Sequence, residues 1–412
     1  MISKKYLFNI LFFGVTSILT AQTKKLNQQD HNVNQAIKTL LVDKDLKNAS
    51  IGFLAKDVKT GEIIAELNPD LSLMPASTQK LVTTAAALEV LGKNYKFTTH
   101  LQYSGDIDTI NRVLKGNIYI HGGSDPTLGS KYFDKEKRYS FFNSWITAIN
   151  KHKIDSVAGF IIGDASRYSY EIAPPKWAWE DVGNYYGAGA NGLTVFDNLY
   201  EIHFQSPALP DKEVKIIKID PEIPGLSINN EVLSSNIGTD EAFIFGSPYT
   251  YNRTIRGTIP KAKSDFEIKG AIPDPAYYLA WLLNQKLIFR GLKTSNKVST
   301  IRLLALNGDT INEIRHDLHV YYSPSLQAII DITNKKSINL FAEHLLNEIG
   351  YKLKHDGSNN AGYEAVTEFW KNKGMDTDGF FIYDGSGLSR TNSVTASQLV
   401  FILTYMKTKS KN

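Results

Sequence analysis

The stretch LMPASTQKLVTTAAALEVLG, residues Leu73–Gly92, decides the fold, because it places a proline, a serine and a lysine at the head of an apolar run. Pro75 suits the start of a helix, where its fixed φ is already helical and its missing N–H is not needed. Ser77 and Lys80 are three residues apart, so a helix brings their side chains to the same face. The stretch therefore predicts an apolar helix over residues 81–91 with a serine and a lysine side by side at its start.

This pair can carry nucleophilic chemistry. A serine hydroxyl is a poor nucleophile until a base takes its proton, and a lysine with a lowered pKa can be that base. Burial among Leu81, Val82 and Ala85, together with the positive end of the helix dipole, lowers the pKa of a lysine. Ser77 is also the only serine in the chain with a lysine three residues later. The alternative interpretation is a capping serine followed by an exposed lysine.

Acyl transfer through a serine also needs a proton path to the leaving group and donors that orient the acyl portion, and a Ser-x-Asn triplet supplies both. We compare three such triplets, at residues 227–229, 337–339 and 358–360. Only Ser337-Ile338-Asn339 falls in a short break between two apolar helical segments. We therefore select Ser337 and Asn339, although the triplet alone would indicate a turn with a helix cap.

The order of secondary-structure signals predicts an inserted region. A hairpin signal surrounds Thr60-Gly61, and short strands divided by Gly, Pro and Asp run from about residue 97 to 260. Helical segments follow at residues 276–289, 324–336, 339–350, 363–374 and 395–407. A β-rich middle between helical ends is typical of an insertion. We expect a discontinuous domain formed by residues 22–97 and 310–412, with a β-rich insertion of two subdomains at 98–309.

The N-terminal residues and the composition indicate where the protein is located and which partners it has. Lys4 and Lys5 precede an apolar stretch, and Ala21 ends a small-residue cleavage point, so residues 1–21 are predicted to be a secretory signal peptide and the protein to be periplasmic. An uncleaved anchor is the alternative, which leaves peripheral membrane association open. Without residues 1–21 the formal net charge falls from +4 to +2, which argues against nucleic acid as a partner.

Composition also argues against a metal cofactor. The chain has no cysteine, which excludes disulfides, thiolate catalysis and cysteine-ligated metals. Only His316 and His319 approach paired ligand spacing, and a strand would place them on opposite faces. We predict no metal and no other cofactor.

Five separated blocks, in this order, resemble the D-alanyl-D-alanine carboxypeptidase/endopeptidases of the low-molecular-mass class C penicillin-binding proteins. They are MPASTQKLVTTAAALEVLG (74–92), GNIYIHGGSDPTL (116–128), WAWEDVGNYYGAGANGLTVFDN (177–198), KKSINLFAEHLLNEIG (335–350) and YDGSGLSR (383–390). The resemblance implies a mixed α/β penicilloyl-serine-transferase (β-lactamase-like) fold with a large insertion after the nucleophile helix. It also implies a serine peptidase that acts on peptidoglycan stem peptides and reacts with β-lactams.

Roles follow from the same resemblance. Ser77 looks like the acylated nucleophile and Lys80 like its base. Ser337 resembles the residue that relays a proton to the departing amine, and Asn339 the one that holds the substrate amide. The backbone N–H of Ser77 would be one oxyanion donor.

Four more residues are candidate substrate ligands. In the aromatic segment 177–189, Asp181 could attract the free amino group of a stem peptide and Tyr186 could form a wall of the cleft; an aromatic plug between domains is the alternative. In YDGSGLSR, Asp384 and Arg390 could bind substrate or could fix a turn.

The sequence departs from the family at its third motif, a Lys-Thr-Gly strand downstream of the Ser-x-Asn loop. Lys59-Thr60-Gly61 precedes the nucleophile at an expected hairpin tip, so we treat it as a decoy, and Lys407-Thr408-Lys409 lacks the glycine. The sheet strands at the C-terminal end are therefore expected to be missing, because the chain is a fragment or is truncated. The alternatives are a non-catalytic wall-binding or scaffold protein, or an inactive fragment; a β-lactamase or esterase on this fold is less favoured, since class A lactamases lack so large an insertion.

Overall fold

The computed structural model describes residues 33–133, 138–309 and 313–412. The predicted signal peptide, residues 1–21, lies outside them. Within these ranges, no helix combines the length and apolar character that crossing a bilayer requires. The chain divides into two compact units. The smaller contains the described residues up to Leu73 with Met375–Phe380 and Ser393–Lys411, and the larger contains Met74–Gly374 with Phe381–Asn392.

The smaller unit contains the predicted hairpin. Strands β1 (Phe53–Lys56) and β2 (Ile63–Leu67) pair antiparallel. The turn between them is closed by Asp57, whose Oδ1 accepts from the N–H groups of Lys59 and Thr60 at 2.7 and 2.8 Å. The Lys-Thr-Gly triplet therefore lies in a turn, as the sequence indicates.

Helical segments complete the smaller unit, one of them at residues 33–41. The 3₁₀ helix η1 (Lys44–Leu46) precedes the hairpin, and helix α10 (Ala396–Thr408) confirms the helix predicted at 395–407. Thr395 and Gln398 form a reciprocal capping box at the start of α10, which satisfies two of its free backbone groups.

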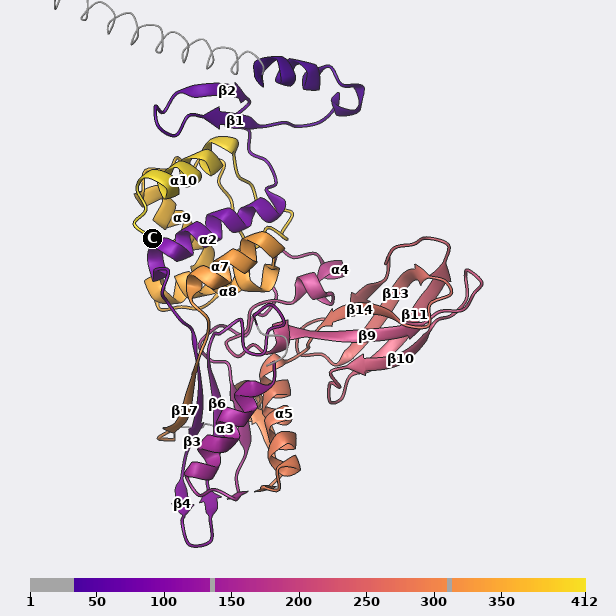
Figure 1. Ribbon diagram of the computed structural model, residues 1–412, viewed down its shortest axis with the longest axis vertical. Coiled ribbons are helices and arrows are strands. Elements are labelled where there is room, and N and C mark those ends of the chain that lie inside the picture. The colour runs from indigo at the N-terminus through magenta and orange to yellow at the C-terminus, as the bar shows by residue number, and fades with distance from the viewer. Residues whose placement is uncertain (1–32, 134–137, 310–312) are drawn as a thin grey trace, which may run out of the picture. The chain divides into compact units, whose positions relative to one another are not determined.

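A layer of helices forms one part of the larger unit. Helix α2 contacts three C-terminal helices, and all four confirm predicted segments: α2 (Gln79–Leu91), α7 (Leu326–Lys336), α8 (Asn339–Lys354) and α9 (Asn359–Asn372) (Figure 1). Residues far apart in sequence thus build one layer, as expected for a domain interrupted by an insertion.

Strands from the part of the chain between α2 and α7 form two larger sheets. The five-stranded sheet has the order β16 (Val298–Thr300), β8 (Ile161–Asp164), β6 (Ile118–Gly123), β3 (Thr98–Tyr103) and β17 (His316–Tyr322). The four-stranded sheet has the order β15 (Lys293–Thr294), β7 (Ser156–Val157), β5 (Val113–Lys115) and β4 (Asp106–Asp108). β17 lies beyond residue 309 yet pairs with β3. That residues 98–309 form an inserted domain stays a prediction from the sequence.

Two three-stranded sheets extend from this region (Figure 1). One has the order β10 (Lys215–Asp220), β9 (Leu199–Gln205) and β14 (Phe266–Ala271), and the other has the order β11 (Ser227–Ser235), β13 (Asn252–Pro260) and β12 (Phe243–Phe245). β14 and β12 are each at the edge of their sheet.

Helices α3 (Ser140–Lys151) and α5 (Pro275–Phe289) pack in the core of the same region. Helix α5 is predicted from the sequence but α3 is not, because α3 lies within the strand-rich part of the chain. Its buried side chains, among them Phe141, Trp145 and Ile149, recur at helical spacing. That period is the sequence signal for this helix.

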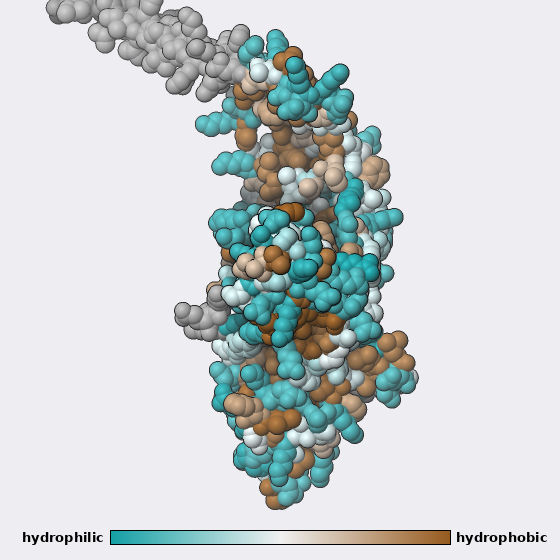
Figure 2. Space-filling view, turned by 90° about the vertical axis from the view of Figure 1, so that its right-hand side faces the viewer, coloured by the Kyte–Doolittle hydropathy of each residue, from teal (hydrophilic) through white to brown (hydrophobic). Residues whose placement is uncertain are grey.

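Polar side chains cover most of the face shown in Figure 2, with smaller apolar areas between them. The large apolar side chains of α3 and α5 are mostly buried in the core. Burial of this apolar surface is the main favourable term for the fold.

Trp145→Ala tests this core. Trp145 is fully buried, so its truncation should lower the free energy of unfolding by about 3–5 kcal/mol. The measurement is urea unfolding followed by circular dichroism. Phe289→Ala is the matched control, because Phe289 is 83% exposed and should change stability by less than ~0.5 kcal/mol. Equal effects of the two substitutions would contradict the assigned core.

Candidate active site

Ser77 lies in a tight turn just before helix α2. The turn is the 3₁₀ helix η2 (Ala76–Thr78), and regular α-helix begins only at Gln79. Ala76 has a φ of +46°, a left-handed conformation that costs energy for a residue with a side chain. Ser77 itself is exposed. The predicted helix start is thus a strained turn that presents the serine to solvent.

A glycine loop packs directly against this turn. Gly387 has a φ of +84°, and a Cβ placed on it would lie 1.8 Å from the backbone oxygen of Ala76. Only a residue without a side chain allows this approach. The loop formed by YDGSGLSR therefore supports the backbone beside Ser77.

Lys80 is the centre of the site. Its side chain is buried, with 2% exposure, one turn after Ser77. The ammonium Nζ donates to Asn339 Oδ1 at 2.7 Å, to the backbone oxygen of Ser386 at 2.8 Å and to Ser77 Oγ at 3.3 Å. An ammonium has three donors, and these contacts use all of them.

The environment of Lys80 favours its neutral form. Burial lowers the pKa of Lys80 to about 8, while the carboxylates of Glu343 and Asp384 act in the opposite direction. A lysine in water has a pKa near ~10.4, so a much larger fraction of Lys80 is neutral at neutral pH. This is the condition that a lysine base requires.

Glu343 is a site residue that sequence analysis missed. It lies on α8 one turn after Asn339 and is fully buried. Its two carboxylate oxygens accept from the N–H groups of Gly385 and Ser386 at 3.0 and 2.8 Å. Burial raises the pKa of Glu343 to about 8, whereas these donors and the Lys80 ammonium lower it. The sequence signal that could have identified Glu343 is an acidic residue four positions after Asn339 within an apolar helix.

Ser337 and Asn339 border the same pocket as Ser77. Ser337 ends α7 with a φ of +55°, and Asn339 begins α8. Asn339 Nδ2 donates to the backbone oxygen of Tyr186 at 2.8 Å. Ser77, Ser337, Asn339 and Tyr186 are among the residues that line a pocket of about 350 Å³. The structure thus brings together the two motifs that we selected from the sequence.

The other two triplets compared in the sequence lie elsewhere. Ser227 begins strand β11. Ser358 caps helix α9, with its Oγ accepting from the N–H of Ala361. Neither serine lines the pocket that contains Ser77.

Asp181 lies behind the wall of this pocket. It is buried in the short helix α4 (Trp179–Val182), and burial together with the nearby Asp181 carboxylate raises the pKa of Tyr186. Burial raises the pKa of Asp181, while the nearby Arg390 lowers it. The exposed Arg390 forms an ion pair with Glu180 at 2.5 Å. Asp181 and Arg390 are therefore neighbours in one charged group.

Asp384 has the geometry of a turn-fixing residue. It is fully buried, and each of its oxygens accepts two hydrogen bonds. The four donors are Trp177 Nε1, the N–H groups of Gly387 and Ser389, and Asn392 Nδ2, at 2.6–2.8 Å. Of the two roles that the sequence leaves open, this geometry supports the turn, so we do not propose Asp384 as a substrate contact.

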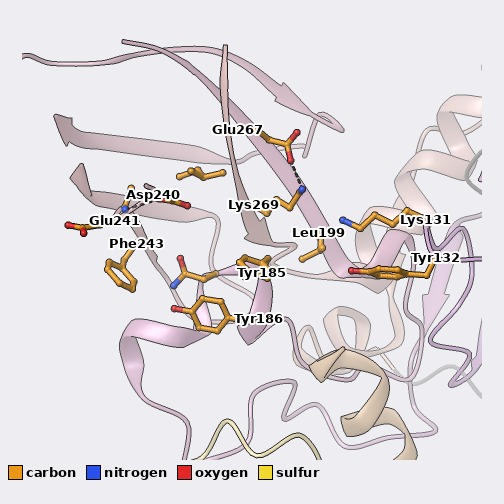
Figure 3. A pocket seen from close by; sticks show the side chains of 13 residues that line it. Lys131, Tyr132, Tyr185, Tyr186, Leu199, Asp240, Glu241, Phe243, Glu267 and Lys269 are labelled. Carbon is orange, nitrogen blue, oxygen red and sulfur yellow. Dashed lines mark hydrogen bonds and ion pairs between the residues drawn. The ribbon is translucent and has the colours of Figure 1, made fainter. Parts of the chain in front are cut away.

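One group of possible metal ligands occurs among the described residues: Glu201, His203 and Glu267. Lys269 forms ion pairs with both glutamates of this group, because its Nζ is 2.5 Å from Glu267 (Figure 3) and 3.9 Å from Glu201. A lysine cation thus already balances this charge. The group does not include His316 or His319.

Gly387→Ala tests the contact with the Ser77 turn. The added Cβ must displace the backbone of Ala76 and also pay the cost of positive φ, so we expect a loss of stability well above the ~1 kcal/mol of the φ cost alone. Thermal unfolding measures it. Gly374→Ala is the control, because Gly374 has a φ of +92° but no atom lies within 4 Å of the position that an added Cβ would take. Equal losses would show that the contact with Ala76 is unimportant.

Residues 33–412 match the D-Ala-D-Ala carboxypeptidase 3 (S13) family. A D-alanyl-D-alanine carboxypeptidase of an Actinomadura strain is 27% identical over 377 residues, which cover 90% of this chain and 67% of that protein. The crystal structure of penicillin-binding protein 4 from Haemophilus influenzae superposes with a TM-score of 0.71 at 22% sequence identity. The matched region covers 86% of this chain and 75% of the Haemophilus chain. A second structure of that protein, in complex with a β-lactam, has a TM-score of 0.66 at 20% identity, with 87% and 75% of the two chains covered.

These similarities confirm the fold predicted from the sequence, a penicilloyl-serine-transferase domain of mixed α/β content with additional domains. They agree with the five sequence blocks that carried the resemblance. The chain therefore belongs to the D-Ala-D-Ala carboxypeptidase 3 (S13) family, the low-molecular-mass class C penicillin-binding proteins.

Proposed function

We propose that this protein is a serine D-Ala-D-Ala peptidase that acts on peptidoglycan stem peptides through an acyl-enzyme at Ser77. The observation that carries this proposal is the contact of the buried Lys80 Nζ with Ser77 Oγ, at 3.3 Å. The pKa of Lys80, lowered to about 8 by burial, makes a neutral amine available as base.

Acylation begins with proton transfer. Neutral Lys80 takes the proton of the Ser77 hydroxyl, and Oγ attacks the carbonyl carbon between the two D-alanines. The carbonyl oxygen becomes an oxyanion, and we assign the backbone N–H of Ser77 as one donor to it. The strained turn at Ala76 holds that N–H and the hydroxyl in a fixed relation.

The tetrahedral intermediate collapses when the leaving amine receives a proton. Ser337 lines the same pocket as Ser77, and we assign its hydroxyl to relay that proton from Lys80 to the amine. Asn339 holds the Lys80 ammonium with its Oδ1 and keeps a second amide hydrogen for the substrate backbone. Water then attacks the acyl-enzyme and releases the shortened peptide.

Asp181, Tyr186 and Arg390 are assigned to substrate recognition. Tyr186 lines the pocket. The carboxylate of Asp181, which lies near Tyr186, suits the free amino group of a stem peptide. The ion pair of Arg390 with Glu180 adds to the same charged group. This assignment requires the substrate side chain to reach past Tyr186.

A substrate in the cell wall requires export. The predicted signal peptide at residues 1–21 would deliver the protein to the periplasm, where the proposed substrate lies. Cleavage after Ala21 would release the protein from the membrane, so this cleavage is part of the proposal.

Ser77→Ala should abolish covalent labelling by a fluorescent penicillin. β-Lactams acylate the serine of such enzymes, and the related Haemophilus protein has been solved in complex with one. Gel fluorescence measures the labelling, and thermal unfolding checks that the variant is folded. Ser358→Ala is the matched control, because Ser358 lies outside the pocket and should leave labelling intact. Labelling that survives Ser77→Ala would overturn the assigned nucleophile.

Lys80→Arg tests the base. Arginine keeps the positive charge but does not lose its proton near neutral pH, so the second-order rate of acylation should fall at least ~100-fold. In the unsubstituted protein the rate should rise with pH and level off above about 8, because only then is most Lys80 neutral. Acylation of the arginine variant at a rate near that of the unsubstituted protein would show that Lys80 acts as a fixed charge.

A non-catalytic wall-binding or scaffold function is the second candidate. Within the described ranges, the sheet formed by β1 and β2 has two strands, and the only Lys-Thr-Gly triplet lies in their turn. The pairing strand and second oxyanion donor expected from the family are thus not identified. A folded protein that binds stem peptides but is not labelled by penicillin would favour this candidate.

A further inference from the structure

The four-stranded sheet has an edge at which three segments of the chain enter parallel strands. β5, β7 and β15 run in the same direction, and Val113, Ser156 and Lys293 are paired across them. The residues just before each strand therefore lie at the same edge of the sheet. None of them lines the pocket that contains Ser77. We call this surface the basic edge and define it as residues 110–112, 151–155 and 288–293.

Hydrogen bonds join the segments of the basic edge. The N–H of Asp155 donates to the backbone oxygen of Arg112 at 2.8 Å, and the N–H of Lys293 donates to the backbone oxygen of Asp155 at 2.9 Å. Arg290, at the end of α5, donates from Nη2 to Asn143 Oδ1 of α3 at 3.1 Å. The side chains of the three segments are therefore presented by one connected framework.

Positive charge dominates the basic edge. Its segments contain five lysines and arginines and one acid, Asp155, so its formal charge of +4 equals that of the whole chain. Arg112 Nε lies 2.5 Å from Asp155 Oδ2 and balances this acid. Such a surface attracts an anionic partner. Among the described residues, no ion pair includes the other four cations, Lys151, Lys153, Arg290 and Lys293.

Large apolar side chains project among these charges. Ile110 is 91% exposed and Phe289 is 83% exposed. Ile110 lies in the turn between β4 and β5, which projects from this end of the larger unit (Figure 1). Asp108 fixes the turn, because its Oδ1 accepts from the N–H groups of Ile110 and Asn111 at 3.2 and 3.0 Å, and its charge is balanced by Lys115. Exposed apolar side chains surrounded by cations are typical of surfaces that lie on membranes.

We propose that the basic edge docks this protein on an anionic phospholipid membrane, with Ile110 and Phe289 in the headgroup region and the lysines and arginines facing the lipid phosphates. Charge complementarity supports this occupant, because each Lys or Arg near an anionic membrane strengthens binding about fivefold. Protruding apolar side chains add a second contribution, and a stable reversible contact needs both. The docking uses neither Ser77 nor its pocket, so it is independent of the proposed function.

Co-sedimentation of the full chain with vesicles tests the docking. Lys151→Gln/Lys293→Gln should weaken binding to vesicles of phosphatidylglycerol and phosphatidylcholine at least ~10-fold, because two cations are lost. Ile110→Ala/Phe289→Ala should weaken it at least ~5-fold, because less apolar surface enters the membrane. The unsubstituted protein should bind pure phosphatidylcholine vesicles less tightly, and high salt should weaken its binding to the anionic ones.

Lys261→Gln/Lys371→Gln is the matched control, because it removes the same charge at two exposed lysines outside the basic edge. It should bind like the unsubstituted protein, and circular dichroism checks that every variant is folded. All variants share the same N-terminal segment, so differences between them report on the basic edge.

A fluorescent label shows which part of the chain meets the membrane. The chain has no cysteine, so Thr109→Cys gives a single labelling site beside Ile110, and Ser227→Cys gives one at an exposed position of β11. An environment-sensitive dye at position 109 should shift its emission to the blue on anionic vesicles. The same dye at position 227 should not change.

Equal binding by the lysine variant and its control, or vesicle-bound protein without a shift at position 109, would overturn the proposal. Binding that depends on the lysines but not on Ile110 and Phe289 would refute the entry of these side chains into the headgroup region. A dimer in sedimentation equilibrium that Ile110→Ala/Phe289→Ala dissociates would identify a second copy of the chain as the occupant and refute the membrane.

Discussion

The burial of one ammonium group, that of Lys80, is the constraint on which the rest of the site depends. A buried charge is costly unless hydrogen bonds replace its hydration. Lys80 meets this requirement with Ser77 nearby and with Asn339 and Ser386, which lie 259 and 306 positions away in sequence. The helical layer must therefore assemble correctly before the lysine can be accommodated.

The carboxylates of Glu343 and Asp384 partly offset the effect of burial on the pKa of Lys80 rather than forming a simple ion pair with it. Full neutralisation by a close acid would hold the lysine protonated and remove its use as a base. Glu343 instead directs both oxygens to the backbone N–H groups of Gly385 and Ser386, and Ser386 presents its carbonyl to Lys80. The acid thus shapes the loop that holds the lysine, while burial keeps the pKa of Lys80 low.

The sequence predicted the parts of the site that depend on local spacing. Ser77 and Lys80 are one turn apart, and Ser337 and Asn339 lie in the break between two helices, so periodicity and helix ends were enough to find them. Glu343 was missed because a single acid in an apolar helix looks like an ordinary variation until its distant partners are known. Asp384 could not be assigned for the same reason, since one of its donors, Trp177, lies 207 residues away in sequence.

The aromatic segment at residues 177–186 is anchored to the site at three points of unequal strength. The exposed ion pair of Arg390 with Glu180 contributes little, because water and salt screen it. The hydrogen bonds from Trp177 to Asp384 and from Asn339 to the backbone of Tyr186 are at least partly buried and leave costly unpaired groups when broken. Since Asn339 also binds Lys80, a shift of Tyr186 would disturb the base itself. This wall of the pocket at Ser77 is therefore held in place by the same contacts that position the catalytic candidates, and a substrate meets a preorganised surface there.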